Sequence, residues 1–176
     1  MKHKTKKLTT CAIFAAIICI VTTFIAIPAP AIGSINLGDI FILCAAWLLG
    51  PIYGGIAAGI GAALADLFSG FAIYAPATLI VKFLMAIVCC TVFSLLSKII
   101  KHNFTVRILS ALCAELVMVI GYFAYEAIVY GFFAALAAIP FNLIQGSVCL
   151  VIGSLVCHFM LKNSTIKGFC NEFSSL

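Results

Sequence analysis

The sequence predicts an all-α integral membrane protein, a bundle of six transmembrane helices forming one domain over residues 1–176. Composition is the first reason, because 65% of the residues are hydrophobic and 9% are charged. A soluble domain carries roughly 25% charged residues and still exposes much of its surface to water. Length is the second reason, since 176 residues fit six helices of roughly 20 residues with short connections. The placement of the basic residues is the third.

Six apolar runs, separated by turn signals, define the expected spans. Pro28 and Pro30 end the first run, and Gly50-Pro51 separates the second from the third. Pro76 falls in the first turn of the fourth run, where a helix tolerates proline. The segment 131–139 is expected to be a short outer helix or a loop. The expected spans are residues 8–27, 37–49, 52–68, 74–96, 106–130 and 140–161.

The basic residues predict the orientation in the membrane. They form three groups, namely Lys2, Lys4, Lys6 and Lys7, then Lys98, Lys101 and Arg107, then Lys162 and Lys167. An even number of spans separates each group from the next, and the intervening outer segments 28–36, 69–73 and 131–139 contain no Lys or Arg. Cytoplasmic loops carry the excess of Lys and Arg. We therefore expect the N-terminal segment 1–7 and the polar tail 162–176 to lie in the cytoplasm. We expect the first apolar run to be an uncleaved helix rather than a signal peptide.

Several classes of protein lack their sequence signals here. There is no phosphate-binding G-x-x-x-x-G-K-[ST] loop, no H-E-x-x-H and no Ser/His/Asp set, so neither an enzyme nor a cofactor is predicted. The nine cysteines form no C-x-x-C pair, and most lie in apolar runs, where cysteine acts as a small hydrophobe. No metal site, disulfide framework or nucleic-acid surface is expected.

Polar side chains inside the spans are the candidate functional residues, because lipid penalises each of them. Most lie in the outer half, with Glu115 alone in the inner half. Tyr122 and Glu126 share a helix face, as do Asn142 and Gln145, and aromatic rings beside polar groups are typical of small-molecule pockets. The expected ligand-binding residues are Asn36, Asp39, Tyr74, Lys82, Tyr122, Glu126, Asn142 and Gln145.

Two of these polar residues also have structural explanations. Lys82 either gives charge complementarity to a ligand, together with Glu126, or neutralises Asp66 or Glu126 in an ion pair. Asp39 either binds ligand or caps the second span.

Small residues four apart predict close helix packing. Gly50/Gly54 and Gly55/Gly59 form such a ladder in the third span, which packs either within the chain or at a subunit interface. Ala12 and Ala16 form another pair in the first span, near its cytoplasmic end.

Taken in order, these strings resemble the substrate-binding S component of an energy-coupling factor (ECF) transporter. The resemblance covers nearly the whole chain. It includes the Ala12/Ala16 pair, "INLGD" at 35–39, "LLGPIYGGIAAGIGAALADLFSG" at 48–70, "YAPATLIVKFLMAI" at 74–87 and "IPFNLIQG" at 139–146. The strings look most like S components for hydroxymethylpyrimidine or pyridoxine, near the riboflavin branch.

The resemblance implies a six-helix S-component fold in the cell membrane and the import of a vitamin from outside. It implies three partner subunits, a transmembrane T component and two cytoplasmic ATPases. Ala12 and Ala16 are similar to the surface that meets the T component. Two alternatives stay open: a riboflavin-type S component, and a membrane scaffold protein whose polar cluster binds no ligand.

Overall fold

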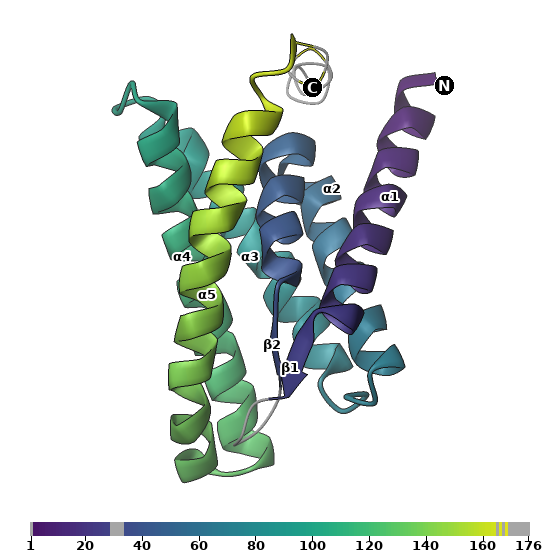
Figure 1. Ribbon diagram of the computed structural model, residues 1–176, viewed down its shortest axis with the longest axis vertical. Coiled ribbons are helices and arrows are strands. Elements are labelled where there is room, and N and C mark those ends of the chain that lie inside the picture. The colour runs from purple at the N-terminus through teal and green to yellow at the C-terminus, as the bar shows by residue number, and fades with distance from the viewer. Residues whose placement is uncertain (1, 29–33, 165, 167, 169–176) are drawn as a thin grey trace.

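The computed structural model describes residues 2–28, 34–164, 166 and 168. The predictions on Pro30, Lys167 and residues 169–176 lie outside this part. The elements, labelled in Figure 1, are α1 (Lys2–Phe24), β1 (Ala26–Pro28), β2 (Ser34–Asn36), α2 (Gly38–Phe68), α3 (Ala75–Leu96), α4 (Asn103–Val129) and α5 (Phe132–Met160). Five helices of the described part are long and apolar enough to cross a membrane. The helical membrane class is confirmed, whereas the count of six separate helices is not.

The predicted second and third spans form the single element α2, which is interrupted at the predicted turn. Gly50 adopts φ 80° and ψ −179° there, and Pro51 follows it. A Cβ atom on Gly54 would lie 2.8 Å from the backbone oxygen of Ala45, although a straight helix would separate these residues by roughly 13 Å. The arm 51–68 therefore folds back along the arm 38–49, and both arms are visible in Figure 1.

Two other boundaries differ from the prediction. The first helix ends at Phe24, and residues 26–28 pair with residues 34–36 as an antiparallel ribbon in the register Ala26↔Asn36. Three-residue strands are too short to show a period in the sequence. The segment 131–139 is neither a loop nor a separate helix, because α5 starts at Phe132 and continues through Pro140.

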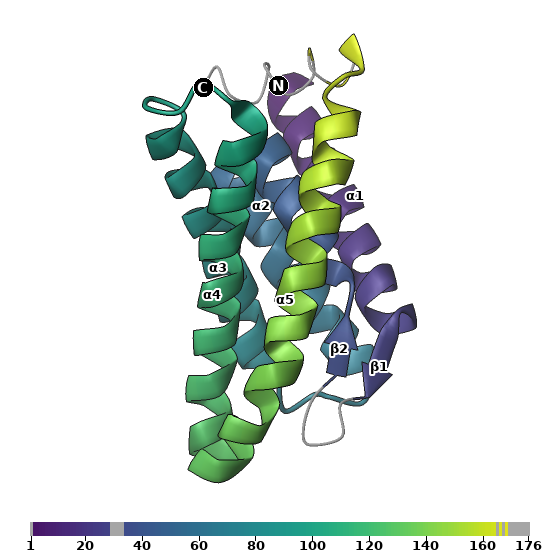
Figure 2. The same cartoon turned by 60° about the vertical axis from the view of Figure 1, so that its left-hand side comes forward.

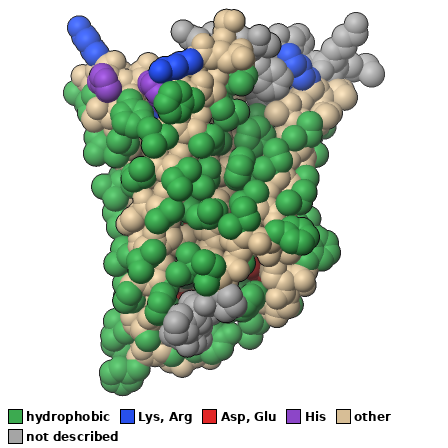
Figure 3. All heavy atoms as spheres, in the orientation of Figure 1, with side chains coloured by type: hydrophobic (Ala, Val, Ile, Leu, Met, Phe, Trp, Pro, Cys, Tyr) green, Lys and Arg blue, Asp and Glu red, His purple; other side chains and the backbone are tan. Residues whose placement is uncertain are grey.

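The helices run along the long axis and give the molecule two distinct ends (Figures 1 and 2). The N-terminal end of α1, the connection 97–102 and the C-terminal end of α5 share one end, which we call the basic end. The ribbon β1–β2, the connection 69–74 and the α4–α5 turn share the other, which we call the pocket end. In the space-filling view the visible Lys and Arg side chains gather at the basic end, and hydrophobic side chains cover much of the visible sides (Figure 3).

Arg107 differs from the other basic residues. It lies in the first turns of α4, within the expected fifth span, and it is 8% exposed. Its guanidinium carbon lies 5.9 Å from the ring centroid of Trp47 and 5.5 Å from that of Phe93. Cation–π contacts of this kind stabilise a partly buried arginine, so Arg107 ties α4 to α2 and α3.

The glycine ladder packs within the chain. A Cβ atom on Gly55 would lie 2.8 Å from the ring of Phe83, and one on Gly59 would lie 2.7 Å from the backbone oxygen of Leu79. Both neighbours belong to α3. The small residues therefore let α3 approach the second arm of α2 closely, as the internal alternative predicted.

Candidate functional site

A polar pocket opens at the pocket end, where β2, the connection 69–74 and helices α2, α3, α4 and α5 converge. Its cavity volume is about 40 Å³, enough for water but far below the roughly 300–1,000 Å³ of small-molecule sites. A vitamin-sized molecule therefore requires the lining to move apart. The lining residues are Ser34, Asn36, Asp66, Phe71, Tyr74, Thr78, Tyr122, Glu126, Asn142 and Gln145.

The structure brings together the residues that the sequence predicted, although it separates them into two layers. The lining includes Asn36, Tyr74, Tyr122, Glu126, Asn142 and Gln145. Asp39 and Lys82 are absent from the lining and lie buried beside it, at 0% and 2% exposure.

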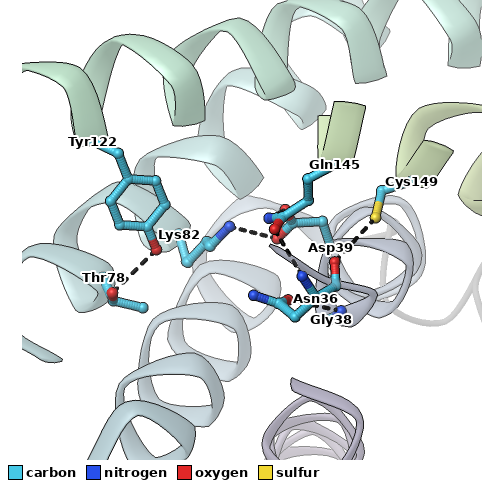
Figure 4. Close-up of polar contacts among 8 residues, drawn as sticks. All are labelled: Asn36, Gly38, Asp39, Thr78, Lys82, Tyr122, Gln145 and Cys149. Atoms are coloured by element: carbon cyan, nitrogen blue, oxygen red, sulfur yellow. Dashed lines mark hydrogen bonds and ion pairs between the residues drawn. The ribbon is translucent and has the colours of Figure 1, made fainter. Parts of the chain in front are cut away.

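The second layer is a buried ion pair that holds a lining residue (Figure 4). Lys82 Nζ donates a hydrogen bond to Asp39 Oδ1 at 2.6 Å, and Gln145 Nε2 donates to Asp39 Oδ2 at 2.6 Å. Gln145 Oε1 in turn accepts from the backbone N–H of Asn36 at 2.9 Å. This chain of contacts joins α3, α2, α5 and β2, and it fixes the amide orientation of Gln145.

Two structural explanations from the sequence are corrected by this network. Lys82 pairs with Asp39, so the expectation that it neutralises Asp66 or Glu126 is wrong. Asp39 does not cap α2, because Leu37 is the N-cap residue. The N–H of Gly38, the first residue of α2, instead donates to Asn36 Oδ1 at 3.0 Å. The position of each residue along its span placed these charges at a similar depth in the membrane. It did not indicate which of the charged side chains face each other.

An aromatic wall closes one side of the pocket. The ring centroid of Tyr74 lies 6.3 Å from that of Tyr122 and 6.0 Å from that of Tyr130. The Tyr74 hydroxyl donates to Glu126 Oε1 at 3.3 Å, and the Tyr122 and Thr78 hydroxyls share a hydrogen bond of 3.0 Å. The wall offers flat apolar faces with polar atoms at their edges, as a ring-stacking site requires.

Four lining residues were missed by the sequence reasoning: Ser34, Asp66, Phe71 and Thr78. Asp66 belonged to the intramembrane charges, and its depth beside Glu126 was a usable signal. Thr78 lies one helical turn after Tyr74 and one before Lys82, so helix spacing could have placed it on the same face. Ser34 lies in the three-residue strand β2 and Phe71 in the connection 69–74, and neither segment is long enough for a period to place the side chains.

Two carboxylate oxygens of the pocket have no hydrogen-bond partner among the described residues. They are Oδ2 of Asp66 and Oε2 of Glu126, and both are buried. A buried polar atom without a partner costs about 1–3 kcal/mol. In the ligand-free pocket, both oxygens can therefore still accept a hydrogen bond from a donor.

Glu115 lies away from the pocket, at the contact of α4 with α5. Its side chain is 4% exposed, and neither carboxyl oxygen has a hydrogen-bond partner within the described part. A Cβ atom on Gly146 would lie 3.3 Å from Glu115 Oε2, so glycine leaves room for the carboxyl group there. Among the described residues no group of three His, Cys, Asp or Glu side chains could hold a metal ion.

Ala12 and Ala16 lie exposed on α1, beside the second arm of α2. They line a shallow apolar groove with a volume of about 550 Å³. The other lining residues are Leu8, Cys11, Ala15, Cys19, Ile20, Ile56, Ile60 and Leu64. We call this surface the α1 groove.

The helices and the pocket define a multi-pass membrane protein with a candidate small-molecule site. Residues 2–162 match the family described as the S component of the ECF-type riboflavin transporter. The chain therefore belongs to this family of transporter components, and the resemblance predicted from the motifs is confirmed.

Two relatives and one solved structure support the same conclusion. An uncharacterised protein of Pyrococcus woesei is 32% identical over 146 residues, which cover 82% of this chain and 95% of the relative. The thiamine precursor transporter HmpT of Lactococcus lactis subsp. cremoris is 29% identical over 166 residues, 93% of each chain. The structure of the S component of a bacterial ECF transporter has a TM-score of 0.65 at 24% identity and covers 90% of this chain and 97% of its own, which shows the fold.

Proposed function

We propose that this protein is the substrate-binding subunit of an ATP-driven ECF-type importer. It captures a small vitamin or vitamin precursor, such as hydroxymethylpyrimidine, pyridoxine or a related heteroaromatic, and delivers it to a transmembrane T component driven by two cytoplasmic ATPases. The observation that carries the proposal is the polar, aromatic-lined pocket in a chain of this family. The similarity to a thiamine precursor transporter favours a pyrimidine.

Each layer of the site has a proposed role. Asn36, Asn142 and Gln145 hydrogen-bond the ligand, Tyr74 or Tyr122 stacks on its ring, and Glu126 accepts a donor from it. Lys82 and Asp39 act indirectly, because they hold the Gln145 amide in place. Their charges compensate each other, so the ligand does not need to supply a counter-ion for Lys82.

We also propose that the two arms of α2 cross the membrane separately, giving six spans with both termini in the cytoplasm. The reversal at Gly50 supports this topology, as does the shared position of the N-terminal end of α1, the connection 97–102 and the C-terminal end of α5 at one end of the molecule. The pocket then faces outward, as capture from outside requires.

Replacing Asn142 by alanine is expected to weaken ligand binding by roughly 1–3 kcal/mol, the penalty for leaving a hydrogen-bonding group unpaired. Isothermal titration with hydroxymethylpyrimidine and pyridoxine measures the loss, with Gln145→Ala and Lys82→Ala beside it. Asn103→Ala is the matched control, since Asn103 is an exposed residue at the basic end. If all three site variants kept full affinity with an intact fold, the ligand would bind elsewhere.

The topology predicts which side of the membrane each end faces. In a chain whose accessible cysteines are replaced by serine, Ser34→Cys should react with an impermeant thiol reagent from outside. Ser97→Cys, at the basic end, should react only after the membrane is opened. Labelling of Ser34→Cys exclusively from the cytoplasmic side would contradict the proposed orientation.

A riboflavin-type S component is the second candidate, because the matched family carries that description. Its larger three-ring ligand would need a greater expansion of the small cavity. Titration with riboflavin separates the two candidates, since tight binding of riboflavin without binding of the smaller rings would favour the second.

A further inference from the structure

The charges around the pocket are unbalanced. Two carboxyl groups, Asp66 and Glu126, line it, and none of the described lining residues is Lys, Arg or His. The nearby cation Lys82 is already paired with Asp39 at 2.6 Å. The lining of the pocket therefore carries acidic groups without a basic group that neutralises them.

Each of the two carboxyl groups has one buried oxygen that can still accept a hydrogen bond. Glu126 receives the Tyr74 hydroxyl on Oε1, which leaves Oε2 for one further donor. Asp66 presents the buried, unpartnered Oδ2. An ionised carboxyl group only accepts hydrogen bonds, so a ligand satisfies both residues only by presenting donors.

These requirements describe a specific chemistry. An exocyclic amino group on a heteroaromatic ring can donate to Asp66, and a hydroxyl group on a substituent of the same ring can donate to Glu126. A phosphate or carboxylate on the ligand would instead bring like charge against both groups, which opposes binding. The faces of Tyr74 and Tyr122 accommodate the ring itself.

We propose that Asp66 and Glu126 are the residues that determine specificity, and that they select an uncharged or cationic aminopyrimidine-type ring over its deaminated and phosphorylated counterparts. The inference rests on the proposed function and deepens it. Asp66 accepts a hydrogen bond from the amino group, and Glu126 accepts one from the second donor.

The test compares ligands that differ by one group, using isothermal titration on the purified full chain. The probes are 4-amino-5-hydroxymethyl-2-methylpyrimidine, its 4-oxo analogue and its phosphate ester. The wild type should prefer the amino compound to the 4-oxo analogue by about tenfold or more, as expected when a buried acceptor loses its donor. It should bind the phosphate ester more weakly still.

The isosteric variant Asp66→Asn should lose most of the preference for the amino compound. Its amide N–H can donate to the 4-oxo group, which the carboxylate repels. Glu115→Gln is the matched control, because Glu115 is a buried carboxyl group outside the pocket, and it should keep the wild-type preference.

The outcomes distinguish failure of the specificity assignment from failure of the proposed function. If the wild type binds the ring but Asp66→Asn keeps the full preference with an intact fold, the assignment of Asp66 is overturned and the proposed function stands. If Asp66→Asn does not fold, wild-type binding of the phosphate ester as tight as that of the free alcohol overturns the inference. If the wild type binds no vitamin probe at all, the proposed function itself fails.

Discussion

Replacing Ala16 by tryptophan is expected to abolish uptake while ligand binding stays intact. Ala12 and Ala16 lie exposed in the α1 groove, at the level of Ile56 and Ile60 on the second arm of α2. Helices in a membrane associate through small residues that let their backbones approach. We propose that the T component docks in the α1 groove. An indole at Ala16 would fill this groove and hold the T component away, whereas the candidate ligand pocket shares no lining residue with the groove.

The measurement pairs uptake in cells with titration on the purified variant. Ile120→Trp is the control, because Ile120 is 64% exposed on α4 and the change adds an indole away from the groove. It should transport normally. Normal uptake by Ala16→Trp would contradict docking of the T component in the α1 groove, and a parallel loss of binding and uptake would indicate misfolding.

Replacing Lys82 by methionine is expected to be the most destabilising change at the site. The substitution leaves the Asp39 carboxyl group buried at 0% exposure without its cation. Breaking one side of a buried pair costs about 3–5 kcal/mol. The melting temperature in detergent should therefore fall by roughly 6–20 °C, at about 2–4 °C per kcal/mol for a chain of this size.

The double variant Asp39→Asn/Lys82→Met distinguishes charge from packing. Removing both charges avoids the uncompensated carboxylate, so this variant should recover at least half of the lost melting temperature. A double variant as unstable as Lys82→Met alone would mean that the shape of the lysine side chain matters more than its charge. A melting temperature unchanged in Lys82→Met would contradict the buried pair.

The sequence predicts those features of the fold that depend only on the free energy of transferring each residue from water into lipid. Burial costs are local, so the apolar runs, the three basic groups and the depth of Glu126 and Asn142 could all be derived from the chain. The turn at Gly50-Pro51 was equally readable, because the residue types themselves demand it.

Features that depend on how helices rotate about their axes could not be derived. Depth alone did not reveal that Lys82 faces Asp39 rather than Asp66, nor that Gln145 joins them. The ribbon of β1 and β2 was missed because its strands are too short for a period. Ser34 and Phe71 were missed as lining residues because a three-residue strand and a connection give no period that places a side chain.

Capture of a small heteroaromatic molecule by the pocket can be tested by mass spectrometry of the small molecules that co-purify with the wild type and with Asn142→Ala prepared in parallel. We expect an amino-substituted single-ring heteroaromatic, such as a hydroxymethylpyrimidine, in the wild type and a clear depletion of it in the variant. Riboflavin as the enriched molecule, or identical small-molecule content in both preparations, would show that the pocket does not capture such a ring.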